Sequence, residues 1–142
     1  MCIRSVVSPG DEVIIPEPCF VCYDPITRMS GGVPVPLETK VENCFKITPE
    51  ELEAKITDKT KLLILPYPNN PTGAVMRREE LERIEPVIEK HNLFVLSDEI
   101  YAELTYGGSR HVSIAEIDGM YDRTVVVGGF SKAYSMTGWR LG

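Results

Sequence analysis

Short apolar runs alternate along the chain with segments in which apolar residues recur at helical spacing. Between residues 77 and 91, Leu81, Ile84 and Ile88 lie three or four residues apart, the period of an amphipathic helix. The run Lys61–Leu65 is almost wholly apolar, which is typical of a strand covered on both faces. Alternation of strands and helices predicts an α/β fold, a mostly parallel sheet with helices on both faces.

The same pattern sets the expected elements. We predict strands at residues 12–15, 33–37, 61–65, 93–96 and 124–127, the last one buried like the others. Helices are predicted at residues 1–7, 18–30, 48–56 and 77–91. Thr48 is a candidate N-cap, followed by Pro49 at the first helical position and Glu51 as the capping-box acid. Pro86 is expected to interrupt and kink the last helix.

Composition argues against several classes of protein. The 142 residues carry 15 basic and 21 acidic side chains, a net charge of -6, which argues against a nucleic-acid partner. No apolar run approaches the roughly 18 residues that a membrane span requires, and no signal peptide is recognisable. Cys19 and Cys22 form a CxxC without a second pair, so we expect no metal site. Reduced thiols fit a cytoplasmic protein best.

Polar side chains follow several of the predicted strands. Asn70 lies in a proline-rich loop after Leu65, Asp98 follows the strand 93–96, and Lys132 follows the strand 124–127. Tyr101 comes three residues after Asp98, on the same side of an expected helical turn. In parallel sheets ligands gather at the carboxyl ends of the strands, where all of these residues are predicted to lie.

Each of these residues also has a plainer interpretation. Asn70 suits a rigid turn, Asp98 the N-cap of a helix, and Lys132 a solvated surface position. Arg140, after Thr137-Gly138-Trp139, suits either a phosphate or a surface ion pair. Taken together, however, an amine, a carboxylate, hydrogen-bond donors and a guanidinium match the needs of pyridoxal 5′-phosphate. That cofactor forms an imine and requires partners for its ring nitrogen, phenolate oxygen and phosphate.

At this point the chain resembles the class I/II aminotransferases of the aspartate aminotransferase fold, fold type I. Asn70-Pro71-Thr72-Gly73 is similar to the family's Asn-Pro-x-Gly loop, and Asp98-Glu99-Ile100-Tyr101 to its Asp-x-x-Tyr. The stretch from Phe130 to Gly142 is similar to the family's lysine signature almost throughout. The resemblance covers the whole chain and is specific for the family rather than for a substrate.

The resemblance implies a role for each candidate residue. Lys132 would bind the cofactor aldehyde and later carry the substrate proton, and Asp98 would pair with the ring nitrogen. The ring's phenolate oxygen would take hydrogen bonds from Tyr101 and Asn70. Phe20, which the residues alone suggest is a core side chain, would stack on the ring. The phosphate would be held by Arg140 and Ser131, with Gly129 in the place where many relatives have a serine.

The resemblance also implies the context. We expect residues 1–142 to be part of the large, cofactor-binding domain, without the upstream phosphate loop and the carboxy-terminal small domain, and to be inactive alone. The parent enzyme would be a homodimer that transfers an amino group between an amino acid and a 2-oxo acid. Two alternatives stay open: a carbon–sulfur lyase or related fold type I enzyme such as an aminocyclopropane-carboxylate synthase, and the effector domain of a transcription regulator.

Overall fold

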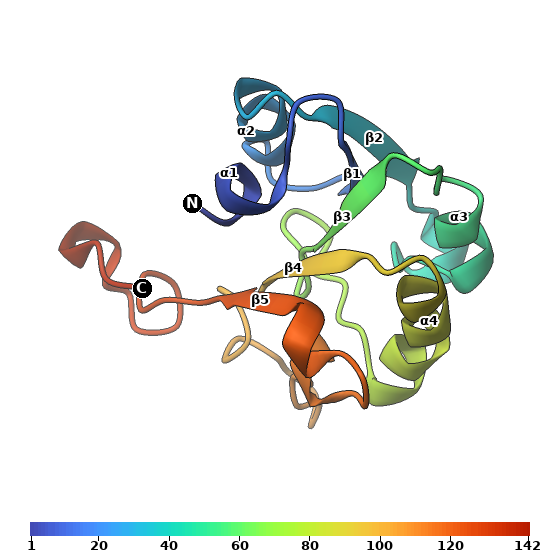
Figure 1. Cartoon of the computed structure of the whole chain (residues 1–142). Coiled ribbons are helices and arrows are strands. Elements are labelled where there is room, and N and C mark those ends of the chain that lie inside the picture. Colours follow the sequence, from blue (N-terminus) through green and yellow to red (C-terminus); the bar gives the residue numbers. More distant parts are fainter.

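The centre of the molecule is a five-stranded, entirely parallel sheet in the order β2-β1-β3-β4-β5 (Figure 1). The computed structural model describes all residues from Met1 to Gly142. The strands are β1 (Glu12–Glu17), β2 (Val33–Glu38), β3 (Thr60–Leu65), β4 (Phe94–Asp98) and β5 (Thr124–Val127). Each predicted strand is present, most of them one or two residues longer, and the predicted fold class is confirmed.

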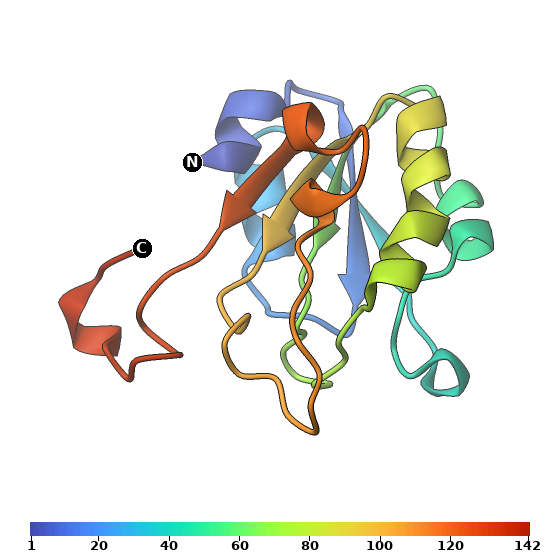
Figure 2. The same ribbon diagram turned by 90° about the horizontal axis from the view of Figure 1, so that it is seen from below.

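Helices cover both faces of this sheet, as expected. The four α-helices are α1 (Cys2–Val6), α2 (Tyr23–Met29), α3 (Pro49–Glu53) and α4 (Arg78–Lys90). Figure 2 shows α1 and α2 on one side of the strands and α3 and α4 on the other. None of these helices is long and apolar enough to cross a membrane.

Strand alternation builds a separate apolar core on each face. Because successive side chains point to opposite faces, Val95 and Leu96 enter different cores. The larger core packs against α3 and α4 and includes Leu63, and the smaller one packs against α1 and α2 and includes Leu62. At about 25 cal/mol for each Å² of apolar surface removed from water, these two cores supply most of the stabilisation of the fold.

The helix boundaries agree with the sequence where local signals are strong. The Thr48 hydroxyl accepts a hydrogen bond from the Glu51 N–H at 3.2 Å, and the Glu51 carboxylate accepts one from the Thr48 N–H at 3.2 Å. This capping box confirms the predicted start of α3, although the helix ends at Glu53 rather than near residue 56. The helix expected from Pro18 begins only at Tyr23, and α4 continues without a break through Pro86.

One expectation about burial is wrong. The three valines of β5, Val125 to Val127, are 41–47% exposed instead of buried. The reason is that β5 is the last strand of the sheet, with a neighbour only in β4. Beyond it, residues 128–142 leave the sheet as turns and one short 3-10 helix (Thr137–Trp139), the red segment of Figures 1 and 2.

Candidate active site

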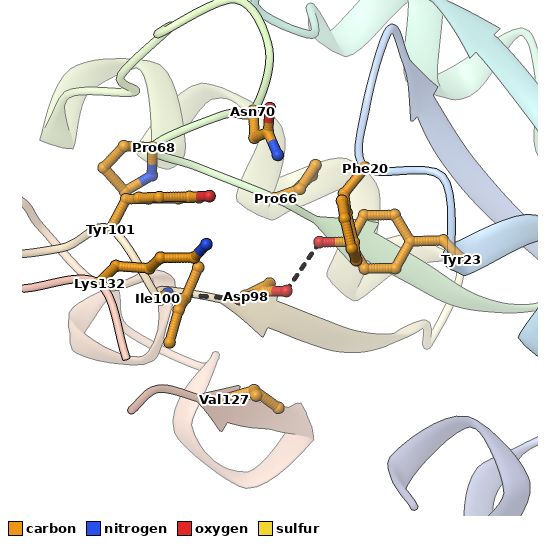
Figure 3. Close-up of a pocket in the computed structure, with 10 residues that line it drawn as sticks. All are labelled: Phe20, Tyr23, Pro66, Pro68, Asn70, Asp98, Ile100, Tyr101, Val127 and Lys132. Carbon is orange, nitrogen blue, oxygen red and sulfur yellow. Dashed lines mark hydrogen bonds between the residues drawn. The ribbon is translucent and has the colours of Figure 1, made fainter. Parts of the chain in front are cut away.

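A cavity of about 240 Å³ lies at the carboxyl ends of β3, β4 and β5 (Figure 3). The strand register brings these ends level, since Leu65 pairs with Ser97 and Asp98 with Val127. The lining residues are Phe20, Tyr23, Pro66, Pro68, Asn70, Asp98, Ile100, Tyr101, Val127 and Lys132. The cavity therefore unites five of the seven residues predicted for the site.

Asp98 ends β4 and turns its carboxylate toward the α2 face of the sheet. Its Oδ2 accepts a hydrogen bond from the Tyr23 hydroxyl at 2.7 Å, and its Oδ1 accepts one from the Ile100 N–H at 3.3 Å. Residues 100–103 form turns rather than a helix, so Asp98 is not the N-cap of a helix. A carboxylate in this position needs such partners to offset the cost of leaving water.

Tyr23 is a site residue that the sequence did not single out. Its ring is buried beneath the cavity, at the first position of α2, and contacts Phe20 edge-on with 6.3 Å between ring centroids. Burial, together with the nearby charge of Asp98, raises the pKa of the Tyr23 phenol far above its usual range. The phenol therefore stays protonated and remains a donor to Asp98. No local pattern links two residues 75 positions apart.

The loop that carries Asn70 is organised by its neighbour Asn69. The Asn69 Oδ1 accepts hydrogen bonds from the Thr72 N–H at 3.1 Å and from the Thr72 hydroxyl at 2.8 Å. Gly73 adopts a φ of 73°, a conformation that side chains with a Cβ rarely tolerate, and donates its N–H to the Asn69 carbonyl at 2.9 Å. With Asn69 occupied in the turn, Asn70 is left with its amide toward the cavity (Figure 3).

Lys132 and Tyr101 reach the cavity from two different segments. The Lys132 Nζ lies 5.8 Å from the centroid of the Tyr101 ring, on the side of the cavity opposite Tyr23 (Figure 3). Tyr101 lies in a non-helical turn instead of the helical turn that was expected, and its side chain still lines the cavity. Phe20 is 48% exposed at the cavity wall and is therefore not the core residue that composition alone suggests.

Arg140 and Ser131 do not line this cavity. The Arg140 Nη1 donates to the Thr137 carbonyl at 3.0 Å, within its own turn, and the side chain is exposed. The Ser131 carbonyl accepts a hydrogen bond from the Thr137 hydroxyl at 3.1 Å. Both belong to the segment that leaves the sheet after β5, so their contact with a phosphate stays a prediction.

Comparison with known proteins places this geometry in a family. Residues 1–142 match the model of the family described as aminotransferase class I and II. YugH of Bacillus subtilis (strain 168), an aminotransferase by name, is 54% identical over 140 residues, which are 99% of this chain and 36% of that protein. An aspartate aminotransferase of Pyrococcus abyssi (strain GE5 / Orsay) is 46% identical over 142 residues, 100% of this chain and 36% of that protein.

Solved structures agree with the sequence comparison. The aromatic aminotransferase of Pyrococcus horikoshii OT3 superimposes with a TM-score of 0.96 at 46% identity, over 99% of this chain and 38% of that one. The Thermus thermophilus aspartate aminotransferase with maleate gives a TM-score of 0.92 at 41% identity, over 99% and 36%. The chain thus spans little more than a third of the length of these relatives. Fold, cavity and sequence together show that the chain belongs to the class I and II aminotransferase family.

Proposed function

We propose that this chain is the cofactor-binding part of an aminotransferase that moves an amino group between an amino acid and a 2-oxo acid. The family uses pyridoxal 5′-phosphate. The observation that carries the proposal is a single cavity that holds a hydrogen-bonded carboxylate, a free amine and two further polar groups, contributed by Asp98, Lys132, Asn70 and Tyr101.

The donor set fits the cofactor group by group. The Asp98 carboxylate can pair with a protonated ring nitrogen, and the Tyr23 phenol holds one of its oxygens in place. Asn70 and Tyr101 can donate to the phenolate oxygen, and Phe20 offers an aromatic face at the cavity wall. When bound, pyridoxal 5′-phosphate supplies an electron sink for the pair left behind by the substrate's α-proton.

Lys132 has two tasks in this proposal. Its Nζ would attach the cofactor covalently, and once an amino acid had displaced it, the free amine would remove the α-proton and return it to the cofactor's former aldehyde carbon. The nearby Tyr101 ring keeps the amine at the cavity through a cation–π contact while it is protonated. Arg140 and Ser131, which belong to the same segment as Lys132, are proposed to bind the phosphate.

The remaining parts of the proposal concern the whole protein. Because the relatives are much longer, we propose that residues 1–142 act within a longer polypeptide, as part of its large domain. Homodimerisation is proposed from the family resemblance and is tested by the mass of the full-length protein in solution. The four cysteines are free, which supports a cytoplasmic, reducing compartment.

The experiment is covalent trapping of the cofactor. Full-length protein loaded with pyridoxal 5′-phosphate is reduced with borohydride, digested and mapped by mass spectrometry. The pyridoxyl group is expected on Lys132 and nowhere else in this chain. Lys61 is the matched comparison, since its Nζ also lies over an aromatic ring, 5.1 Å from the centroid of Phe94, but outside the cavity. A label on Lys61 or another lysine would refute the assignment.

A further inference from the structure

The carboxylate of Glu99, the residue after Asp98, is buried on the opposite side of the sheet end from the cofactor cavity. Ser97 and Glu99 share the face of Val95, which packs into the core beneath α4, whereas Asp98 lies on the face of α2. The Glu99 side chain is only 9% exposed. It does not line the cofactor cavity, and the function proposed above leaves it without a role.

Three side chains converge on this carboxylate. Its Oε1 accepts hydrogen bonds from the Ser97 hydroxyl at 2.9 Å and from the Ser113 hydroxyl at 2.6 Å. Its Oε2 lies 2.9 Å from the His111 Nε2, a close contact that is off the direction of an ideal hydrogen bond and becomes an ion pair when the imidazole is protonated. Burial raises the pKa of Glu99, but these three contacts outweigh it and leave the pKa below its usual range.

The partners come from the two ends of one loop. Ser97 and Glu99 lie where the loop begins, and Glu99 donates its N–H to the Val127 carbonyl of β5 at 2.7 Å. His111 and Ser113 lie where the loop ends, just before Ile114, which is 1% exposed in the larger core. Between these ends the tip, residues 106–110, is exposed. The Glu99 carboxylate therefore links the beginning of the loop to its end.

Tyr101 lies within this loop, two residues after Glu99. The turn that presents it begins at Glu99, whose carbonyl accepts the Ala102 N–H at 2.9 Å, and continues with the Leu104 N–H on the Tyr101 carbonyl at 2.9 Å. We propose that Glu99 is a positioning residue, whose carboxylate closes the loop up to Ser113 and thereby holds Tyr101 in the cofactor cavity. This inference rests on the proposed function, because the contact of Tyr101 with the cofactor is part of it.

The test follows the bound cofactor rather than turnover. Full-length protein loaded with pyridoxal 5′-phosphate is titrated with pH, and the midpoint of the change in its visible absorbance is recorded. A phenol that donates to the phenolate oxygen favours the deprotonated form, so Tyr101→Phe is expected to raise this midpoint by roughly one unit. Glu99→Gln is expected to raise it by about half as much and to weaken cofactor binding about three- to tenfold.

A double-mutant cycle decides whether Glu99 acts through Tyr101. In the Tyr101→Phe background, Glu99→Gln is expected to shift the midpoint no further. The matched control is Glu53→Gln, which neutralises a second carboxylate in contact with a histidine, 2.9 Å from the His91 Nε2 where the end of α3 meets the end of α4, and should leave the midpoint unchanged. If Glu99→Gln reduces the yield of folded protein, His111→Gln, which removes one contact only, is expected to shift the midpoint in the same direction.

The outcomes separate the two proposals. If Tyr101→Phe raises the midpoint and Glu99→Gln does not, or if Glu99→Gln adds an equal shift in both backgrounds, Glu99 does not position Tyr101 and the inference is overturned while the proposed function stands. A loss of thermal stability without a shift of the midpoint overturns it as well. If Tyr101→Phe itself leaves the midpoint unchanged, the role of Tyr101 in the proposed function fails, and the inference fails with it.

Discussion

At the scale of single residues, the site contains a hydrogen bond between two segments that are distant in the sequence and lie on the same face of the sheet. Asp98 needs a hydrogen-bond donor because it is partly removed from water, and the donor is the buried Tyr23 phenol. Since the raised pKa of Tyr23 keeps its proton in place, the Tyr23 hydroxyl remains a hydrogen-bond donor to the Asp98 carboxylate. In the function proposed above, this hydrogen bond would orient Asp98 toward the cationic ring nitrogen of the cofactor.

Removal of each partner separately tests this arrangement. Asp98→Asn in the full-length protein is expected to leave the cofactor bound but to lower transamination by several orders of magnitude, because an amide cannot hold the ring nitrogen protonated. Tyr23→Phe keeps the carboxylate and loses one hydrogen bond, so turnover should fall only about three- to tenfold. Steady-state kinetics of both variants are the measurement. Equal losses would show that the carboxylate is ineffective without Tyr23.

At the scale of elements, some helix starts are determined by local hydrogen bonds and others by long-range packing. The start of α3 follows from four consecutive residues, Thr48 to Glu51, whose hydrogen bonds are made within the segment. The start of α2 does not, because residues 18–22 stay irregular in order to bring Phe20 and Tyr23 under the cavity. Proline is compatible with the first turn of a helix, but α2 begins five residues after Pro18, at Tyr23.

The capping box gives a stability prediction at this scale. Thr48→Ala removes the acceptor for the Glu51 N–H and is expected to destabilise the protein by about 1 kcal/mol. Thr48→Ser keeps an acceptor oxygen in the same place and should lose much less. Urea unfolding of both variants, followed by circular dichroism, measures the difference. Matching midpoints for the alanine and serine variants would mean that the hydroxyl contributes nothing to α3.

At the scale of the whole molecule, one edge of the sheet and the segment that follows it are open to solvent. The valines of β5 are exposed, and Phe130, Tyr134 and Trp139 are 48%, 60% and 72% exposed in residues 128–142. Because exposed apolar surface of this kind is typical of a region that packs against other protein, we expect it to be covered in the whole protein.

We therefore expect the 142 residues on their own to show no transaminase turnover, even with excess cofactor. Substrate orientation contributes roughly 7–11 kcal/mol to such reactions, and this chain places no arginine in the cavity to hold a substrate carboxylate. The exposed surface should also promote self-association, visible by size-exclusion chromatography. A coupled assay with several amino donors, run beside the full-length protein, is the measurement, and comparable turnover from both would show that the site is complete within these residues.

The sequence by itself determined the parallel α/β fold, the strands, the capping box and the identity of the residues at the strand ends. These features depend on the period of apolar residues and on chemistry within a few positions, both of which can be read along a chain. Only the tertiary structure decided that Tyr23 serves Asp98, that Glu99 joins both ends of its loop, and that β5 is an exposed edge. Each of these depends on which distant segments lie side by side, and that is settled by the order and register of the strands.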